Sequence, residues 1–244
     1  MISDVQPVIW KEWRELLRMS GTGRAALGRH IFSVGIIGVI WPWQFGLPFV
    51  HSGLAVALAA VTALMYIAGA APDAFAGERE RHTLETLLAS RVPDQAILLG
   101  KIIALVEYGC LAAVIMLIIG LITVNVVHGH GQFLMFSPTQ LISMLVFTPL
   151  AAGLMASIGV HVSLRAKTVK QAQQMLSTAV LIVLFLPAIA FPYVPDNWRS
   201  GVVRMLQSEE RAYIAGGLAV AMLLLQALLF ALAAVRFKRG RLIL

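Results

Sequence analysis

The chain has 244 residues, of which 59% are hydrophobic and 13% are charged, whereas an ordinary soluble domain has about 25% charged residues. This composition excludes a soluble globular protein and indicates an integral membrane protein. The net charge of +7 does not indicate nucleic-acid binding, because the charged residues lie in the gaps between apolar runs, where a basic excess reports membrane topology. A single cysteine, Cys110, excludes an intrachain disulfide.

The N-terminal segment, residues 1–29, contains an amphipathic pattern over residues 5–18. Apolar side chains recur there at positions i, i+4, i+7 and i+8, namely Ile9, Trp13, Leu16 and Leu17. Charged side chains occupy the other face, namely Lys11, Arg14, Glu15 and Arg18. A basic amphipathic helix with a tryptophan at its edge is typical of a helix that lies on a membrane surface. We therefore expect an interfacial helix here rather than a solvated arm.

Residues 30–236 contain six apolar runs, and each is long enough for a membrane span of about 20 residues. We predict spans at about residues 31–50, 52–71, 96–127, 141–164, 175–193 and 213–235. The first run is interrupted by Pro42 and Pro48, and the short join near His51 predicts a tight external hairpin between the first two spans. The predicted fold is an all-α integral membrane protein with six transmembrane helices.

The basic residues predict the orientation of these spans, because Lys and Arg are enriched in cytoplasmic connections. Sixteen of the 19 basic residues lie in or next to the N-terminal segment, the connections after the second and fourth predicted spans, and the tail at residues 237–244. The other side carries Arg199, Arg204 and Arg211. We expect both termini on the cytoplasmic side of the membrane.

The most charged stretch of the chain lies between the second and third predicted spans, and we call residues 77–92 the charged segment. Glu78 and Glu80 open it, where the positive end of a helix dipole favours acids, and Arg81 and Glu85 have the spacing of an i, i+4 ion pair. An apolar stripe is formed by Leu84, Leu87 and Leu88. This pattern predicts one short amphipathic helix on the cytoplasmic side, lying flat under the bilayer with its leucines inward.

The end of the charged segment is marked by two residues. Pro93 cannot continue the helix, and Asp94 is placed to cap the helix of the third span. A stop-transfer loop is the alternative interpretation, but such a loop needs only a few basic residues and not a helix of about four turns with both signs of charge. A docking element for a soluble partner explains the pattern better.

The stretch GERERHTLETLLASRVPDQAILLGKI resembles the signature of the type-2 ABC transporter permeases, in which a segment of the form E-R/K-E … G-T-L-E-L-L-L … P … LGK follows the second span. The matching residues are Glu78, Arg79, Glu80, Thr83, Leu84, Glu85, Leu87, Leu88, Pro93, Gly100 and Lys101. The six-span layout and the interfacial helix are similar to that family as well. The chain departs from the pattern at His82, where a glycine is usual, and we expect little effect because a helix tolerates histidine better than glycine.

The resemblance implies that the charged segment is a coupling helix, which sits in a cleft of a separate ATPase subunit. The working complex would contain two permease chains, identical or different, and two ATPase chains, with ATP and Mg bound by the ATPase. Closure of the ATPase pair would move the coupling helices and open the path between the permeases. The implied ATPase-coupling residues are Glu78, Arg79, Glu80, Arg81, Thr83, Leu84, Glu85, Leu87 and Leu88.

The resemblance also bears on residues 191–211, which precede the last span. Their composition alone fits an ordinary external loop as well as a re-entrant segment. In similar proteins this part forms short re-entrant helices near the exit, and we expect them here. Because the resemblance is to prokaryotic half-transporter permeases, it implies a location in the inner membrane.

The chain lacks the sequence of a nucleotide-binding P-loop, G-x-x-x-x-G-K-[ST]. Its one Gly-Lys pair is Gly100-Lys101, with Gln95 at the position of the first glycine and Ile102 at the position of the Ser/Thr. We therefore expect no catalytic residue and no cofactor on this chain, and an energy source on another polypeptide.

Glu107 is the deepest ionisable residue, about 15 Å along the third predicted span at roughly 1.5 Å per residue. A carboxylate at that depth is expected to face protein or a polar cavity, so that Glu107 is a candidate pathway or gating residue. Tyr108 and Asn125 are candidates for the same polar environment. The alternative is that Glu107 is buried in protonated form and hydrogen-bonded to a neighbouring helix.

Three further patterns carry less functional information. His128 and His130 lack an acidic or thiol companion, so that no metal site is predicted, and His161 fits a hydrogen-bonded residue near the end of the fourth span better than a ligand. Gly153 and Ser157 have a small-xxx-small spacing, which permits close approach of two helices in a membrane. These small residues indicate packing and do not identify a substrate.

Other functions fit the sequence less well. A secondary transporter or channel working without an ATPase predicts inverted repeats and broken helices with ionisable residues near the membrane midplane, whereas this chain has no clear repeat and only Glu107 at depth. An intramembrane enzyme requires catalytic groups that converge from several spans. Within the family, a haem exporter and a permease of a cofactor-assembly system stay open, and no residue identifies the cargo.

Overall fold

The computed structural model describes residues 2–19, 34–197 and 211–237. Every regular element in these ranges is a helix, as the predicted all-α fold requires. The α-helices are α1 (Ile2–Met19), α3 (Trp41–Phe45), α4 (Leu47–His51), α5 (Leu54–Ala70), α6 (Ala76–Glu80), α7 (Leu84–Ala89), α8 (Asp94–His128), α9 (Pro138–Arg165), α10 (Val169–Ala190) and α12 (Arg211–Arg236). The remaining elements are the π-helix η1 (Ile36–Ile40) and the 3-10 helices η2 (Ala71–Ala74) and η3 (Phe191–Tyr193).

Five helical stretches in the described residues are long and apolar enough to cross a membrane. They are Leu54–Glu80, Asp94–His128, Pro138–Arg165, Val169–Tyr193 and Ala212–Arg236. These stretches correspond to the second to sixth predicted spans, and each extends beyond the apolar run that predicted it at one end or both. The chain is therefore a multi-pass membrane protein, as its composition predicts.

The first predicted span, residues 31–50, is not one straight helix. Within its described part η1 passes into α3, and α3 ends at Gly46, whose backbone φ is +57°. Pro48 lies in the first turn of α4, because a proline is tolerated there but not in a helix interior. The described residues of this run are therefore broken helices, and they contribute the shorter apolar helix Ile36–Phe45. The join to α5 at residues 52–53 is short, as predicted.

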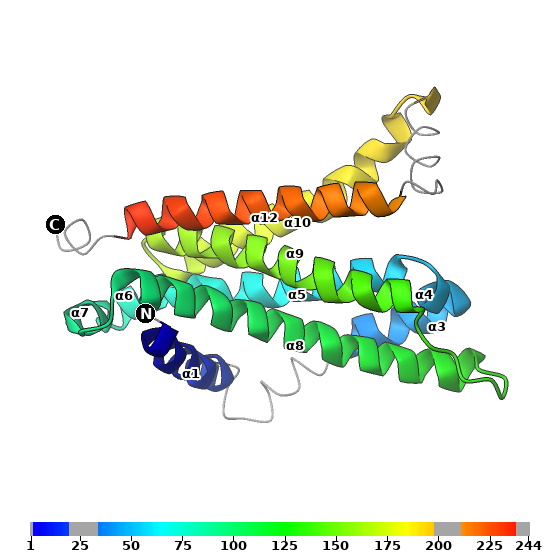
Figure 1. Ribbon diagram of the computed structural model, residues 1–244, viewed down its shortest axis with the longest axis horizontal. Coiled ribbons are helices and arrows are strands. Elements are labelled where there is room, and N and C mark those ends of the chain that lie inside the picture. The colour runs from blue at the N-terminus through cyan, green and yellow to red at the C-terminus, as the bar shows by residue number, and fades with distance from the viewer. Residues whose placement is uncertain (1, 20–33, 198–210, 238–244) are drawn as a thin grey trace.

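Helices α5, α8 and α9 form the centre of the bundle, with α1 along α8 and α12 along α9 (Figure 1). On α5 the fully buried side chains recur at every fourth residue, at Ala55, Ala59, Ala63 and Ile67. Small residues at this spacing let helix backbones approach closely in a membrane. By contrast, most apolar side chains of α10 and α12 are exposed, which suits helices that face lipid.

The close helix approach predicted at Gly153 is confirmed between α9 and α12. The side-chain amide of Gln226 occupies the space in which a Cβ atom on Gly153 would lie. Further along α9, the Nε2 atom of His161 lies 2.9 Å from the carbonyl oxygen of Leu229. His161 is thus a hydrogen-bonded residue between two helices, as expected, and Ser157 is buried in the same part of α9.

The predicted N-terminal helix is confirmed as α1, which packs along α8. Its buried face consists of Val5, Val8, Glu12 and Leu16. Of the predicted apolar stripe, Leu16 is buried and Leu17 is 60% exposed on the single chain, whereas the acid Glu12 is buried. Gly100 on α8 permits this packing, since a Cβ atom there would lie 2.7 Å from the Cγ1 atom of Val8.

Asp94 does not occupy the position that was predicted for it. Asp94 is the first residue of α8 and Pro93 is its N-cap, so that the predicted capping role of Asp94 is wrong. Residues 20–29 of the N-terminal segment, residues 198–210 of the predicted re-entrant segment and residues 238–244 of the tail lie outside the described residues.

Gly100 provides a test of the contact between α1 and α8. Gly100→Ala should destabilise the protein by about 1–3 kcal/mol, because the added methyl group overpacks against Val8. Gly69→Ala is the matched control, since a Cβ atom at Gly69 has nothing within 4 Å. Thermal unfolding of the variants in detergent measures the difference, and Val8→Ala should restore the stability of Gly100→Ala. Equal melting temperatures for the two glycine variants would contradict the packing.

Candidate functional site

The charged segment lies at the same end of the bundle as α1 and the C-terminal end of α12 (Figure 1). It is not the single helix predicted for residues 77–92. Helix α6 ends at Glu80, three residues form a turn, and α7 begins at Leu84. Two short helices therefore replace the predicted helix, and the residues of the turn explain the break.

The break is centred on His82, whose φ of 55° is in the left-handed region. The His82 N–H donates to the carbonyl of Arg79 at 3.1 Å, and the Thr83 N–H donates to the carbonyl of Glu78 at 2.9 Å. These two bonds form a Schellman helix end, whose left-handed position is usually a glycine. His82 therefore does not lie inside a helix, as was expected, but ends α6 in a conformation that glycine adopts more readily.

The same break redirects Arg81. The predicted Arg81–Glu85 pair needs a continuous helix, and Arg81 instead donates to both carboxylate oxygens of Asp73, at 2.9 and 3.2 Å. Burial lowers the pKa of Arg81, but the hydrogen bond and the charge of Asp73 outweigh it and the pKa is raised overall. Gly77 makes room for this carboxylate, because a Cβ atom on Gly77 would overlap an oxygen of Asp73. Arg81 thus ties the turn to η2.

Glu78 lies in a charge cluster, which consists of Lys11, Glu12, Glu78 and Lys101. The Glu78 side chain is 2% exposed, and its Oε1 atom accepts hydrogen bonds from the Nζ atoms of Lys11 at 2.8 Å and Lys101 at 3.0 Å. The Lys101 side chain is 1% exposed and also binds Glu12 Oε1 at 2.7 Å. The charge cluster therefore joins α1, α6 and α8, with Glu12, Glu78 and Lys101 buried and Lys11 partly exposed.

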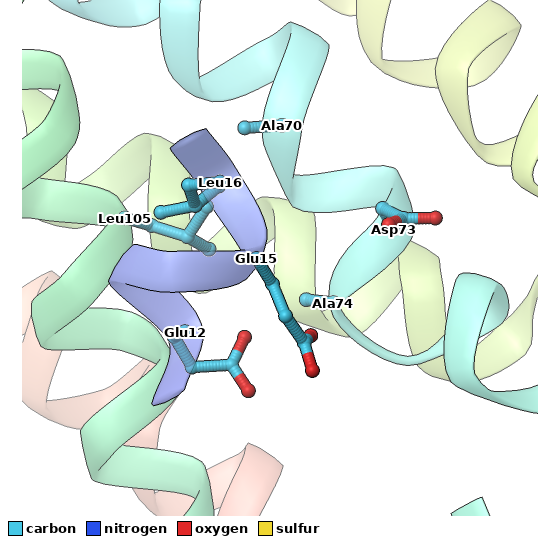
Figure 2. Close-up of a pocket in the computed structure, with 7 residues that line it drawn as sticks. All are labelled: Glu12, Glu15, Leu16, Ala70, Asp73, Ala74 and Leu105. Atoms are coloured by element: carbon cyan, nitrogen blue, oxygen red, sulfur yellow. The ribbon is translucent and has the colours of Figure 1, made fainter. Parts of the chain in front are cut away.

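A small cavity lies beside the charge cluster, and Figure 2 shows Glu12 and Glu15 of α1 at its edge. The lining residues are Glu12, Glu15, Leu16, Ala70, Asp73, Ala74 and Leu105. Oxygen atoms of Glu12, Glu15 and Glu78 lie within 4.8 Å of one another, a spacing that a metal ion could use. The Lys11 ammonium group lies within 3.4 Å of all three carboxylates, so that ion pairs account for the grouping. Burial lowers the pKa of Lys11, but these acids raise it overall.

Arg79 and Glu80 face the connection between α9 and α10. The Arg79 guanidinium group donates to the carbonyl oxygens of Leu164 at 3.1 Å and Ala166 at 2.6 Å, at the end of α9. A carboxylate oxygen of Glu80 accepts a hydrogen bond from the N–H of Val169, the first residue of α10, at 2.9 Å. Each side chain thus satisfies backbone groups that a helix end leaves without partners.

Helix α7 has a buried side and an exposed side. Leu84 is 8% exposed and Leu87 is half-buried, so that these leucines face the bundle as predicted. Leu88 lies in α7, and its side chain is outside the described part of the structure. Glu85 and Thr86 are exposed. The exposed members of the predicted coupling set are Glu80, Arg81, Thr83 and Glu85.

The three pathway candidates do not gather in one place. Glu107 is exposed on the single chain and accepts a hydrogen bond of 2.5 Å from the indole N–H of Trp13. The ring of Tyr108 packs against the same tryptophan at a centroid distance of 6.3 Å. Asn125 lies about 27 Å further along α8, at 1.5 Å per residue. Its amide bonds the N–H and the carbonyl of Leu134 at 2.8 and 2.9 Å, which fastens the loop after α8.

Within the described residues, His128 and His130 do not belong to a group of three or more potential metal ligands. The His128 ring packs against Gly46, where a Cβ atom would lie 2.9 Å from it. His130 lies in the turn after α8 with a φ of 40°. The His128 ring is therefore part of the packing around Gly46, and His130 is part of the turn that follows α8.

Sequence reasoning missed the pairing of Glu12 with Lys101. Lys101 resembles other basic residues at the flank of a span, and Glu12 is one of several charges on an amphipathic helix. The available signal was that Glu12 interrupts the spacing of Val5, Val8 and Leu16, because an acid among buried apolar positions needs a cation opposite it. The helix that supplies the cation is visible only in the tertiary structure.

His82→Gly should keep or raise the melting temperature, because glycine relieves a strain of about 1–2 kcal/mol at a left-handed position and loses part of that gain to its greater flexibility when unfolded. His82→Val should lower it, since a β-branched residue is disfavoured at positive φ. Thermal unfolding tests both variants, with Thr86→Val in the exposed face of α7 as control. A lower melting temperature for His82→Gly than for His82→Val would contradict the helix-end geometry.

Lys101→Met should destabilise the protein by about 3–5 kcal/mol, because it leaves buried carboxylates without their cation. Lys167→Met, at an exposed position near the end of α9, is the control. Adding Glu12→Gln to Lys101→Met should recover part of the loss, since it removes one uncompensated charge. Unfolding by titration with a denaturing detergent measures each change, and fully additive losses in the double variant would contradict the pairing.

Comparison with known proteins agrees with a helical membrane bundle of this kind. The sequence model of the ABC-2 type transporter family matches residues 4–206 of the chain, a range that includes α1, the charged segment and four of the five described spans. Comparison with curated proteins and with solved structures gave no match. The chain therefore belongs to the ABC-2 type transporter family and is a membrane-spanning permease component of an ABC transporter.

Proposed function

We propose that the chain is the permease subunit of an ATP-driven exporter, which couples ATP hydrolysis by a separate ATPase subunit to movement of a substrate across the membrane. The observation that carries the proposal is the exposed face of α7, with Glu85 and Thr86 accessible and Leu84 buried beneath them. An exposed helix face whose other side is packed on the bundle suits a soluble partner that pushes on the membrane domain.

The nucleotide belongs to the partner in this proposal. ATP and Mg are bound by the ATPase, because Gly100 and Lys101 lack the remainder of a P-loop. In the fold these two residues lie in the contact between α1 and α8. Gly100 packs against Val8, and Lys101 forms an ion pair with Glu12. Two permease chains, identical or different, assemble with two ATPase chains.

We infer that the end of the bundle with α1 and α7 is cytoplasmic, because 16 of the 19 basic residues belong to that side. In a prokaryotic cell the membrane is the inner membrane. A first crossing that includes the apolar helix Ile36–Phe45 brings the proposed number of spans to six.

Glu107 and Tyr108 border the substrate pathway in this proposal, and Asn125 lies at its far end. The support for Glu107 is its exposure on the single chain, because a carboxylate on a spanning helix is disfavoured against lipid and requires a polar cavity or a protein partner. The second permease chain supplies such a surface. The Trp13 indole fixes the carboxylate beside α1.

Glu85→Lys should release the ATPase from the tagged chain, because it reverses an exposed charge on the docking face. The measurement is a mild-detergent pull-down from the native membrane, with mass spectrometry of the partners and an ATPase assay of the eluate. We expect a stoichiometric Walker-A protein with the wild type and at least about tenfold less with Glu85→Lys, which corresponds to about 1.4 kcal/mol of binding free energy.

Gln132→Lys is the control for this experiment, because Gln132 is exposed in the loop between α8 and α9 at the other end of the bundle. Leu84→Asp is less specific, since Leu84 is buried and the carboxylate would disturb α7 itself. A wild-type chain that elutes without an ATPase, also after crosslinking, would contradict the proposal and favour transport without ATP hydrolysis.

A further inference from the structure

Two consecutive residues of the charged segment hold both ends of the connection between α9 and α10. The connection is short, residues 166–168, and neither helix is joined to α6 along the chain. The Arg79 guanidinium group lies on the last carbonyls of α9, and the Glu80 carboxylate lies on the first N–H of α10. The side chains that make these contacts are more than 80 residues away in sequence from their partners.

The signs of the two charges match the two helix ends. The C-terminal end of a helix carries partial negative charge and the N-terminal end carries partial positive charge, so that a cation suits the end of α9 and an anion suits the start of α10. Hydrogen bonds to charged groups are stronger than hydrogen bonds between neutral groups. Exchange of the two charges would place each against a helix end of like sign.

A second contact fixes the last turn of α9 to the start of α6. The Ser163 hydroxyl group accepts hydrogen bonds from the N–H groups of Phe75 and Ala76, each at 3.0 Å, and donates to the carbonyl of Pro72 at 2.7 Å. Ser163 is fully buried. The last turn of α9 thus has two contacts with this part of the chain. Ser163 bonds the start of α6 and the residues just before it, and Arg79 within α6 bonds the end of α9.

We propose that Arg79 and Glu80 are positioning residues that make the α9–α10 connection move together with the charged segment. Along the chain, the charged segment is connected only to α5 and α8. Through Arg79 and Glu80, a displacement of α7 also moves α9 and α10. The inference rests on the proposed function, because it assigns the route by which a partner that pushes on α7 reaches α9 and α10.

This assignment separates docking of the partner from transmission to the spans, two roles that the family resemblance gives to one set of residues. Arg79 is half-buried and its guanidinium group is occupied by backbone carbonyls, and the exposed Glu80 bonds the start of α10. Glu85 and Thr86, in contrast, are exposed on α7 beyond the break at His82. Docking of a partner therefore belongs to α7, and transmission to the spans belongs to α6.

Spin-label distances test the linkage in the intact chain. In a Cys110→Ala background, cysteines replace Thr86 on α7 and Lys170 on α10, both at exposed positions, and pulsed EPR measures the distance between their nitroxide labels in lipid nanodiscs. We expect one narrow distance distribution for the otherwise unchanged chain. Adding Arg79→Ala and Glu80→Ala should produce a second population at longer distance.

Two control variants separate the linkage from general disturbance. Arg91→Ala removes an exposed arginine of the same segment and should leave the distribution unchanged. Glu80→Gln, with Arg79 unchanged, keeps a side-chain oxygen that accepts the hydrogen bond from the Val169 N–H. This variant should therefore retain most of the narrow distance population. A monodisperse elution profile and a single cooperative unfolding transition for Arg79→Ala/Glu80→Ala verify the fold. If that variant keeps the wild-type distance distribution, the inference is overturned.

The same labels report on motion in the complex with the copurified ATPase. Addition of a non-hydrolysable ATP analogue should leave the distance from Thr86 to Lys170 unchanged in the wild type, because both ends move together, and should lengthen it in Arg79→Ala/Glu80→Ala. A lengthening in the wild type would overturn the inference while the proposed function stands. Absence of an ATPase from the eluate of the unlabelled wild-type chain would refute the proposed function alone, since the distances in the isolated chain still decide the linkage.

Discussion

The ion pairing of a buried carboxylate holds the functional end of this bundle together. Glu78 is 1% exposed, and the ammonium groups of Lys11 and Lys101 lie at hydrogen-bond distance from it. Removal of a charge from water costs several kcal/mol, and this cost is offset only while well-oriented partners remain in place. Because the two lysines belong to α1 and α8, neither helix can separate from the charged segment without exposing or isolating a charge. The position of the whole segment depends on this constraint.

Four consecutive charged residues of α6 and its end reach four different parts of the fold. Glu78 contacts α1 and α8, Arg79 the end of α9, Glu80 the start of α10, and Arg81 the end of the second span at Asp73. A helix has 3.6 residues per turn, so that one turn directs successive side chains to all sides. The left-handed residue His82 then stops α6. This stop leaves α7 as a separate helix whose exposed face is not used by the bundle.

Much of the fold could be predicted from the sequence, because membrane spans follow from apolar length alone. The second to sixth spans and the N-terminal helix are where the apolar and amphipathic patterns place them. The break at Gly46 in the first run and the break at His82 in the charged segment were not predicted. In both, a backbone conformation with positive φ, at Gly46 and at His82, ends a helix inside a pattern that is otherwise helical. Periodicity does not report such a residue.

The sequence by itself determined that the chain is a helical membrane protein and which segment carries its charges outside the lipid, because hydropathy and charge placement are local properties. It also determined the leucine side of α7. Only the tertiary structure decided which charged residues are buried links and which are accessible. Lys101 and Glu12 are 89 residues apart, and Glu80 and Val169 are likewise 89 apart. The packing of the helices determines these partners, and no local pattern specifies that packing. Burial then determines how much each charged residue changes the free energy of folding.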